Sequence, residues 1–384
     1  MVKLENIPAI LDWFYEARLK ALERLTVHLI GPPGVGKSAI IFTWAQDKAK
    51  QLDKKFVDYD TLTPERVTEI LKAPSQYFIF ADKRLTGLMP EDLSGIPRQV
   101  DFYIRFLPLD LAMLLSKCAG ILVLDEFLNE RRDNMLASAF KLTRDYKIGD
   151  LALSKDALVV AASNGAEHSS LSNNICKPLR DRFAFIRVDR PSLEAWTVWM
   201  DQTYGVAGWN RTCLAYLRWK ESDFLTNIED TGLDDGLEPP ATPRGWTAVA
   251  TYTMKSLTAG LNEDDVAEFI RGKLGSVGER YWGFMQNRIP SFEELAKRPS
   301  VIKGYNIEQK YLVAVTIADA INLRKERIKT AVPIIHFIAE NDDREIINAT
   351  FAMLEAQRKL EVFAEVREDP VIFRAMEATG KALL

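Results

Sequence analysis

The segment that most constrains this chain is GPPGVGKS, at residues 31–38. It follows an apolar run at 26–30, short enough for a buried strand, and it precedes 39–45, which is typical of the start of a helix. Between a strand and a helix, the pattern GxxxxGK followed by Ser or Thr predicts a loop that binds phosphate. Its glycines let backbone N–H groups converge on one anion, and the helix N-terminus adds a partial positive charge.

The same pattern gives the last residues of the loop their roles. We expect Lys37 to contact the outer phosphates and Ser38 to offer its hydroxyl to Mg²⁺. The predicted nucleotide-binding residues are Gly31, Pro32, Pro33, Gly34, Val35, Gly36, Lys37, Ser38 and Ala39. A phosphate-binding loop alone does not distinguish kinases, GTPases, motors and remodelling ATPases.

A second apolar run, at 121–124, leads directly into Asp125 and Glu126. Such a run is typical of a buried parallel strand whose carboxyl end opens into a site. We expect Asp125 to hold Mg²⁺, through water or via Ser38, and Glu126 to take a proton from an attacking water. The alternative for this segment is a surface strand that happens to end in acidic residues.

Two later apolar runs also carry polar residues at their ends. The run at 157–162 leads into Asn164, which can orient a water beside a terminal phosphate or cap a loop. The run at 184–188 is preceded by Arg180 and Arg182 in the motif LRDRF. Five short apolar strands that alternate with helices predict a parallel, doubly wound α/β sheet with flanking helices. Beyond residue 189 the pattern is almost wholly helical.

Composition limits the partners and the compartment. Hydrophobic residues make up 47% and charged residues 27% of 384, as in soluble globular proteins, and the net charge of −4 speaks against the whole molecule attracting nucleic acid. Cys118, Cys176 and Cys213 are few and odd in number, which predicts a reducing compartment without disulfides. We expect a cytoplasmic protein, because no signal peptide and no bilayer-spanning run is evident. The lysine-rich segment 48–55 is expected to be a solvated surface.

In chain order, GPPGVGKS, LVLDEF, VVAASN, LRDRF and TPRGW resemble the motifs of MoxR-type AAA+ ATPases. The segments PEDLSGIP and YKIGDLAL, on either side of the acidic strand, resemble this family more specifically. The resemblance covers nearly the whole chain. It departs at about 54–75, which lengthens the path to the second strand, and at 128–132 (LNERR), where the family tends to have a shorter, less charged turn.

The resemblance implies a division into three parts. These are an AAA+ nucleotide-binding core with a five-stranded sheet over 1–189, a helical lid over 190–260 and a helical C-terminal extension over 261–384. In TPRGW, Thr242 and Pro243 suit the N-cap and first position of a helix, so Arg244 falls in its first turn. By the resemblance, Arg244 is a lid sensor of the γ-phosphate, acting in cis or in trans.

The resemblance also implies a ring, usually a hexamer, that binds ATP and Mg²⁺ between neighbouring subunits. Arg182 would then be the arginine that reaches the neighbour's nucleotide, with Arg180 as second choice and a salt bridge to Asp181 as the alternative. The predicted catalytic residues are Lys37, Glu126, Asn164, Arg180, Arg182 and Arg244, and the predicted metal ligands are Ser38 and Asp125.

Two further segments are implied to transmit hydrolysis, an insert within 95–107 and a hairpin over 145–156. Phe102 and Tyr103 of the insert either grip a client or pack within it. The implied function is to remodel, mature or metallate a client protein with a von Willebrand A-domain adaptor. One alternative is a nucleic-acid motor or loader, against which the acidic balance speaks. Another is a small-molecule kinase, which leaves Glu126, Asn164 and the paired arginines unexplained.

Overall fold

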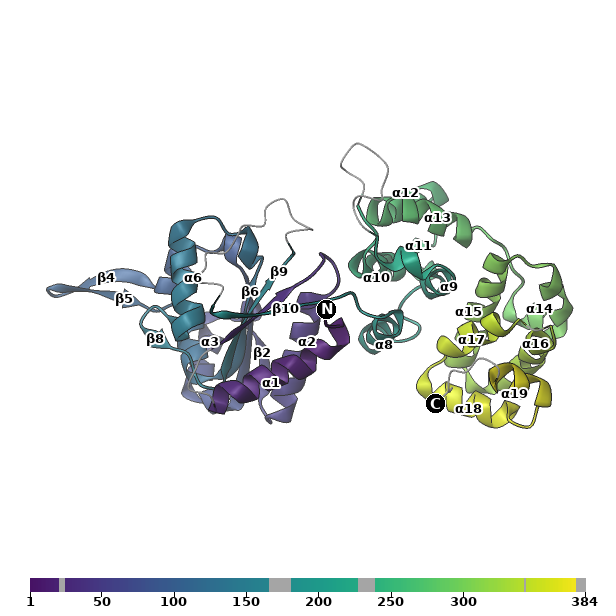
Figure 1. The fold of residues 1–384 in the computed structure, drawn as a ribbon, viewed down its shortest axis with the longest axis horizontal. Coiled ribbons are helices and arrows are strands. Elements are labelled where there is room, and N and C mark those ends of the chain that lie inside the picture. Colours follow the sequence, from purple (N-terminus) through teal and green to yellow (C-terminus); the bar gives the residue numbers. More distant parts are fainter. Residues whose placement is uncertain (21–24, 166–180, 227–238, 342, 378–384) are drawn as a thin grey trace. The chain divides into compact units, whose positions relative to one another are not determined.

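The computed structural model describes residues 1–20, 25–165, 181–226, 239–341 and 343–377. The chain forms two compact units, Met1–Ser192 and Leu193–Leu384. The first is an α/β unit and the second is helical (Figure 1). The predicted α/β class with a helical C-terminal region is therefore confirmed, whereas the predicted further division at residue 260 stays a prediction.

A six-stranded parallel sheet forms the centre of the first unit. Its strands in spatial order are β10 (Phe183–Arg187), β1 (Thr26–Ile30), β9 (Ala157–Ser163), β6 (Ala119–Asp125), β3 (Tyr77–Arg84) and β2 (Lys55–Asp58). The prediction of five strands was wrong by one, because β2 lies in the segment interpreted as extra material. The strand order places β9 between the strand that precedes the glycine-rich loop and the strand that ends in Asp125.

The segment 48–55 is only in part the solvated surface that its lysines predict. Lys55 is exposed, but it begins β2, an edge strand that pairs with β3 and buries only Val57 fully. Lys48 lies on α2 (Lys37–Gln51) and is 6% exposed, with its ammonium 3.0 Å from Asp12 Oδ1. Lysine stems readily cover apolar surface while the charged end finds a partner, so the prediction for this residue was wrong.

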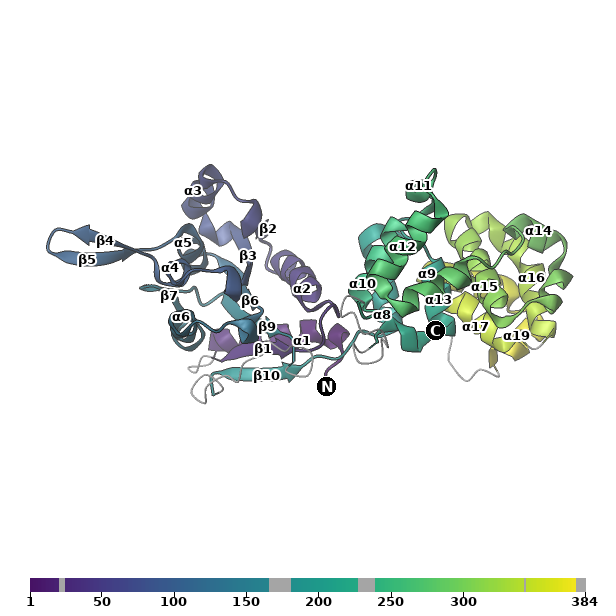
Figure 2. The ribbon, with the colours of Figure 1, turned by 90° about the horizontal axis from the view of Figure 1, so that it is seen from above.

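Helices cover both faces of the sheet (Figure 2). On β6, Ile121 and Val123 pack with the helices of one face, and Leu122 and Leu124 with those of the other. The first face is covered by α1 (Ile7–Lys20) and α2, and the second by α3 (Pro64–Lys72), α5 (Asp110–Lys117) and α6 (Asp133–Asp145). Because successive residues of a strand point to opposite faces, a strand covered on both sides is a continuous apolar run.

Two antiparallel hairpins extend from the first unit. The short pair β7 (Lys147–Ile148) and β8 (Leu151–Ala152) lies within the predicted hairpin 145–156. The longer pair, β4 (Ile96–Val100) and β5 (Tyr103–Leu107), follows α4 (Pro90–Ser94) and makes up most of the predicted insert. In Figures 1 and 2 this ribbon projects away from the sheet.

The second unit is built from helices around one apolar core that includes the fully buried rings of Trp246, Tyr216 and Tyr281. Its first helices are α8 (Leu193–Tyr204), α9 (Thr212–Trp219), α10 (Pro243–Tyr252), α11 (Lys255–Thr258), α12 (Glu263–Leu274) and α13 (Ser276–Met285). The later ones are α14 (Phe292–Lys297), α15 (Ile307–Leu323), α16 (Ile328–Glu340), α17 (Arg344–Ala352), α18 (Ala356–Val366) and α19 (Pro370–Glu377). Among the described residues, no helix is long and apolar enough to cross a membrane.

Candidate functional site

The glycine-rich loop has the backbone that an anion-binding loop requires. Gly34 and Gly36 have φ of 73° and 104°, in the left-handed region that residues with a Cβ rarely adopt. Gly36 is the N-cap of α2, so the helix begins at Lys37. The first N–H groups of this 15-residue helix have no partner within the helix, and they can donate to a phosphate in the loop.

The ammonium of Lys37 lies inside the loop. Lys37 is 8% exposed, and its Nζ donates to the carbonyl oxygens of Gly31 and Pro32 at 2.9 Å each. It also donates to Asn164 Oδ1 at 3.2 Å. Asn164 reaches Lys37 because β9, which ends one residue before it, pairs directly with β1. The structure thus brings together two predicted site residues that are 127 positions apart.

Ser38 and Asp125 meet beside the same loop. The Ser38 hydroxyl donates to Asp125 Oδ2 at 3.4 Å, and Asp125 Oδ1 accepts the N–H of Glu126 at 2.8 Å. A hydroxyl and a carboxylate are hard oxygen ligands of the kind Mg²⁺ takes, with waters and substrate phosphates completing its octahedral shell. Within the described ranges no group of three or more His, Cys, Asp or Glu could hold a metal ion. The Ser38 hydroxyl and the Asp125 carboxylate leave the other coordination positions to waters and phosphate oxygens, so the donor set fits Mg²⁺ bound together with a nucleotide.

Glu126 is held by residues that sequence reasoning missed. It has a φ of 55°, unusual for a residue with a side chain, which turns the chain sharply after β6. Thr86 Oγ1 donates to Glu126 Oε2 at 3.3 Å, and Arg84 Nε lies 3.9 Å from Oε1. The register of β3 on β6 explains the proximity, because Arg84 lies opposite Asp125.

A third carboxylate, Asp82, lies near this site and was also missed. It is half-buried on β3, and its Oδ1 has no hydrogen-bond partner among the described residues. Burial, reinforced by the neighbouring Asp125 carboxylate, raises the pKa of Asp82 to about 6. The sequence signal was a single Asp directly after the apolar run of β3.

The hydroxyl of Ser163 joins three segments of the site. It donates to its neighbour's carbonyl, Ala162 O, at 2.7 Å and accepts the N–H of Leu128 at 3.0 Å. His28 Nε2 lies 2.8 Å away, and since the single hydroxyl hydrogen is used, Nε2 is the donor in this contact. Ser163 is followed by Asn164, while Leu128 lies two residues after Glu126. The hydroxyl therefore fixes the ends of β6 and β9 to each other.

His28 itself is completely buried on β1. Burial lowers the pKa of this imidazole to about 3, so it is neutral at physiological pH. Its Nδ1 has no partner among the described residues, which is tolerable for a lone pair and costly for an N–H. The imidazole packs among aromatic rings at centroid distances of 5.0 to 5.5 Å, those of Phe127, Phe183 and Phe185.

Of the two arginines predicted for the neighbour's nucleotide, the structure describes only Arg182. Arg180 lies outside the described residues. Arg182 precedes β10, and its carbonyl accepts the N–H of Thr26, the first residue of β1. Arg182 therefore lies at the amino ends of the strands, whereas the glycine-rich loop follows the carboxyl end of β1. The length of the strand separates the two by roughly 15 Å. The Arg182 Nε is buried and bonds no atom of the described residues.

Arg244 belongs to the second unit. It is exposed in the first turn of α10, and Thr242 caps that helix by accepting the N–H of Gly245 at 3.1 Å. The buried Trp246 indole donates to Asp223 O at 2.9 Å. The Asp223 carboxylate in turn accepts from Arg280 Nη2 at 3.1 Å. Helix α10 is thus firmly placed within its unit, and the sensor role of Arg244 stays a prediction.

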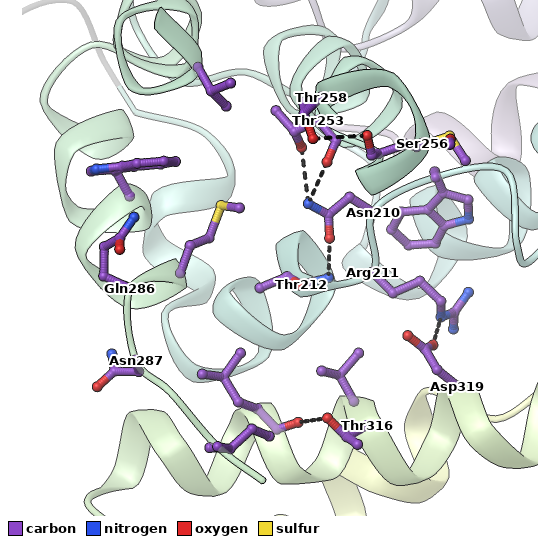
Figure 3. A pocket seen from close by; sticks show the side chains of 18 of the residues that line it. Asn210, Arg211, Thr212, Thr253, Ser256, Thr258, Gln286, Asn287, Thr316 and Asp319 are labelled. Carbon is purple, nitrogen blue, oxygen red and sulfur yellow. Dashed lines mark hydrogen bonds and ion pairs between the residues drawn. The ribbon is translucent and has the colours of Figure 1, made fainter. Parts of the chain in front are cut away.

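A groove of about 960 Å³ also opens in the second unit, along α9, α13 and α15 (Figure 3). Asn210 Nδ2 donates to Thr253 Oγ1 at 3.0 Å, and Asn210 Oδ1 accepts the N–H of Thr212 at 3.1 Å. Arg211 Nε lies 3.1 Å from Asp319 Oδ1. These polar side chains are thus paired with one another along the wall of the groove.

No protein-family model matches the sequence, and a search of curated proteins gives no match. Among solved structures, the chain is similar to the Thermotoga maritima RuvB Holliday junction branch migration motor, at 16% identity over 82% of this chain and 88% of that chain, with a TM-score of 0.32. It is similar to Cdc6p from Pyrobaculum aerophilum at 14% identity, over 97% and 84%, with a TM-score of 0.38. A chain of the HORMA:CdnC:Trip13 complex of E. coli MS115-1 matches at 12% identity, over 76% and 90%, with a TM-score of 0.31. The fold described above rests on the chain's own strand order and register.

Proposed function

We propose that this chain is an AAA+ ATPase of the MoxR type that hydrolyses ATP with Mg²⁺. The observation that carries the proposal is the meeting of Lys37, Ser38, Asp125 and Asn164 at one edge of the sheet, with Glu126 next to them. These residues come from the ends of three adjacent parallel strands, the place where open α/β sheets bind ligands. A kinase needs the loop and a metal ligand, but it does not need a carboxylate beside Asp125.

Each residue has a role that its position allows. Lys37 exchanges its contacts with the Gly31 and Pro32 carbonyls for oxygens of the outer phosphates. Glu126 accepts a proton from the attacking water, and Asn164 orients that water. Ser38 and Asp125 hold Mg²⁺, which supplies positive charge to the phosphate oxygens.

The position of Arg182 supports a ring in which neighbouring copies share each site. Within one chain Arg182 lies at the amino ends of the strands, away from the glycine-rich loop at their carboxyl ends, which supports its action on a nucleotide bound by a second copy. An arginine supplied in trans is worth about 10³–10⁵ in rate. Loss of Arg182 is therefore expected to raise the barrier by roughly 4–7 kcal/mol. We propose a hexameric ring, with Arg244 acting as the lid sensor.

The projecting ribbon β4–β5 supports a protein client. Phe102 at its turn is fully exposed, and Tyr103 and Ile104 are 50% and 66% exposed. Exposed aromatic and aliphatic side chains of this kind mark contact sites. We propose that the ring remodels, matures or metallates its client with a von Willebrand A-domain adaptor, and that the β7–β8 hairpin transmits the nucleotide state.

Mixing two inactive variants tests the shared site. In a mixed ring, a subunit with Arg182→Ala retains Glu126, and it receives Arg182 from a neighbour that carries Glu126→Gln. We expect each variant alone to be inactive and the mixture to regain ATPase activity. Arg187→Ala, which removes an exposed arginine from the far end of β10, the strand that Arg182 precedes, should leave activity unchanged.

Specific activity of the wild type should also rise with protein concentration as rings assemble. A wild type without ATPase activity contradicts the proposal as a whole, whereas an active wild type whose variants do not complement contradicts only the shared site. The Glu126→Gln variant loaded with ATP should retain the client during purification, which identifies it.

A further inference from the structure

The segment LNERR, at 128–132, forms a compact clasp in the structure. Glu130 is only 2% exposed. Its Oε1 accepts the backbone N–H of Arg131 at 2.9 Å and of Arg132 at 2.7 Å. The Arg132 side chain completes the shell, with Nε donating to Oε1 at 2.9 Å and Nη2 to Oε2 at 2.6 Å. The bonds from Arg132 hold the pKa of Glu130 below its usual range, so the carboxylate is charged at neutral pH.

The guanidinium of Arg132 connects this clasp to a different part of the chain. One Nη2 hydrogen bonds Glu130 Oε2, and the other is shared between the carbonyl oxygens of Leu85 and Thr86, at 3.2 Å each. These residues belong to η4 (Leu85–Gly87), the turn that follows β3. The bidentate bond to Glu130 fixes the plane of the guanidinium, so the two carbonyls are held at a set position.

Thr86 completes a closed chain of contacts that returns to the proposed base. Its hydroxyl donates to Glu126 Oε2 at 3.3 Å, while its carbonyl is held by Arg132. Glu126 is four residues before Glu130, and its side chain is 36% exposed. The other side-chain contact described above, Arg84 Nε to Glu126 Oε1, is longer at 3.9 Å. The Thr86 hydroxyl is therefore the closer restraint on where this partly exposed carboxylate points.

We infer that Glu130 and Arg132 are positioning residues that set the orientation of Glu126 through Thr86. This inference rests on the proposed ATPase function and adds to it a device that the family resemblance does not supply, since the resemblance breaks at LNERR. The reason for an effect on rate is geometric, because a displacement of about 1 Å at a reacting group can cost about 10²-fold in rate.

Arg132→Gln tests the inference. The variant removes the donors to the Leu85 and Thr86 carbonyls, so we expect kcat for ATP to fall about 10- to 100-fold. The dissociation constant for a fluorescent ATP analogue should stay within about twofold, because the phosphate contacts are untouched. The matched control is Arg131→Gln, which removes the same charge from the adjacent, exposed arginine and should leave kcat unchanged.

A double-mutant cycle separates positioning from simple stabilisation. Thr86→Val removes the hydroxyl, and if Arg132 acts through Thr86, adding Arg132→Gln should lower kcat by less than about twofold more. Arg132→Lys keeps a charge beside the buried Glu130 but cannot form the paired bonds, so it should fold and still lose kcat.

The outcomes are distinct. The inference is overturned if the reductions in kcat of Thr86→Val and Arg132→Gln multiply in the double variant. It is also overturned if folded Arg132→Gln or Arg132→Lys protein has a normal kcat. Both results leave the ATPase proposal intact. A wild type without ATPase activity overturns both.

Discussion

Replacing Ser163 with alanine should destabilise the first unit strongly, although it removes a single oxygen atom. The Ser163 hydroxyl is buried, and it accepts the Leu128 N–H at 3.0 Å and the His28 Nε2–H at 2.8 Å. Alanine leaves both donors without a partner in a place that water does not reach. An unsatisfied buried donor costs about 1–3 kcal/mol, so the loss of an acceptor for two donors should lower the free energy of unfolding by about 2–6 kcal/mol.

A second serine provides a matched control. Ser138 lies partly exposed on α6, and its hydroxyl donates to the Asn134 carbonyl one turn earlier. Ser138→Ala removes the same atom and should change the free energy of unfolding by no more than about 0.5 kcal/mol. Both variants are compared with the wild type by urea unfolding of the full chain, followed by far-UV circular dichroism.

Amide hydrogen exchange localises the effect. In Ser163→Ala the Leu128 amide should exchange faster than in the wild type, because its acceptor is gone. Ser163→Ala within about 1 kcal/mol of the wild type, with Leu128 still protected, would refute the assignment of the hydroxyl as the acceptor of both donors. The same result would remove the argument that Ser163 fixes Asn164 relative to Glu126.

Three further predictions concern charge and ligand. Between pH 7 and pH 5 the unfolded chain protonates His28, while the folded imidazole, with a pKa of about 3, does not. In urea unfolding the wild type should therefore lose about 2 kcal/mol more stability over this range than His28→Gln. Asp82, with a pKa raised to about 6, is charged and unfavourable above that pH, so Asp82→Asn should stabilise at pH 8 and have less effect as the pH falls toward 5. MgATP at about 100 times its dissociation constant should stabilise the wild type by about 2.7 kcal/mol in thermal melts, and Lys37→Ala should abolish the shift.

Four of the five strands that sequence reasoning found, β1, β3, β6 and β9, are buried along most of their length. The fifth, β10, is an edge strand that was found because its residues still form an apolar run. In β6, Ile121, Leu122, Val123 and Leu124 are all inaccessible to solvent, so no polar residue interrupts the run. The edge strand β2 has one neighbour and places a lysine and an aspartate at its ends. Its pattern is that of a charged surface segment, and only the pairing with β3 makes it a strand. An edge strand of this composition has no signal that a window of residues can detect.

The residues of the site differ in whether the sequence could predict them. Lys37, Ser38, Asp125 and Asn164 were predictable because the chemistry demands those side chains, and adjacent parallel strands had to bring them to one edge. Thr86 was not predictable, because its place beside Glu126 depends on strand register over 40 residues. Arg132 was still less so, since it holds the Leu85 and Thr86 backbone carbonyls, which any residue type would provide.

The arginine that donates in such a contact can nevertheless be recognised in the sequence. Arg132 follows the buried Glu130 by two residues, in a turn that is shorter and less charged in the resembling family. Its presence there has to be explained by the groups that its guanidinium contacts. Backbone acceptors are invisible to motif searches, but the charged pair that anchors the donor is not, because a glutamate is almost never fully buried without a partner. The charged turn LNERR therefore marks Arg132 as a residue with a specific role, and its guanidinium contacts the backbone of η4 rather than the glycine-rich loop.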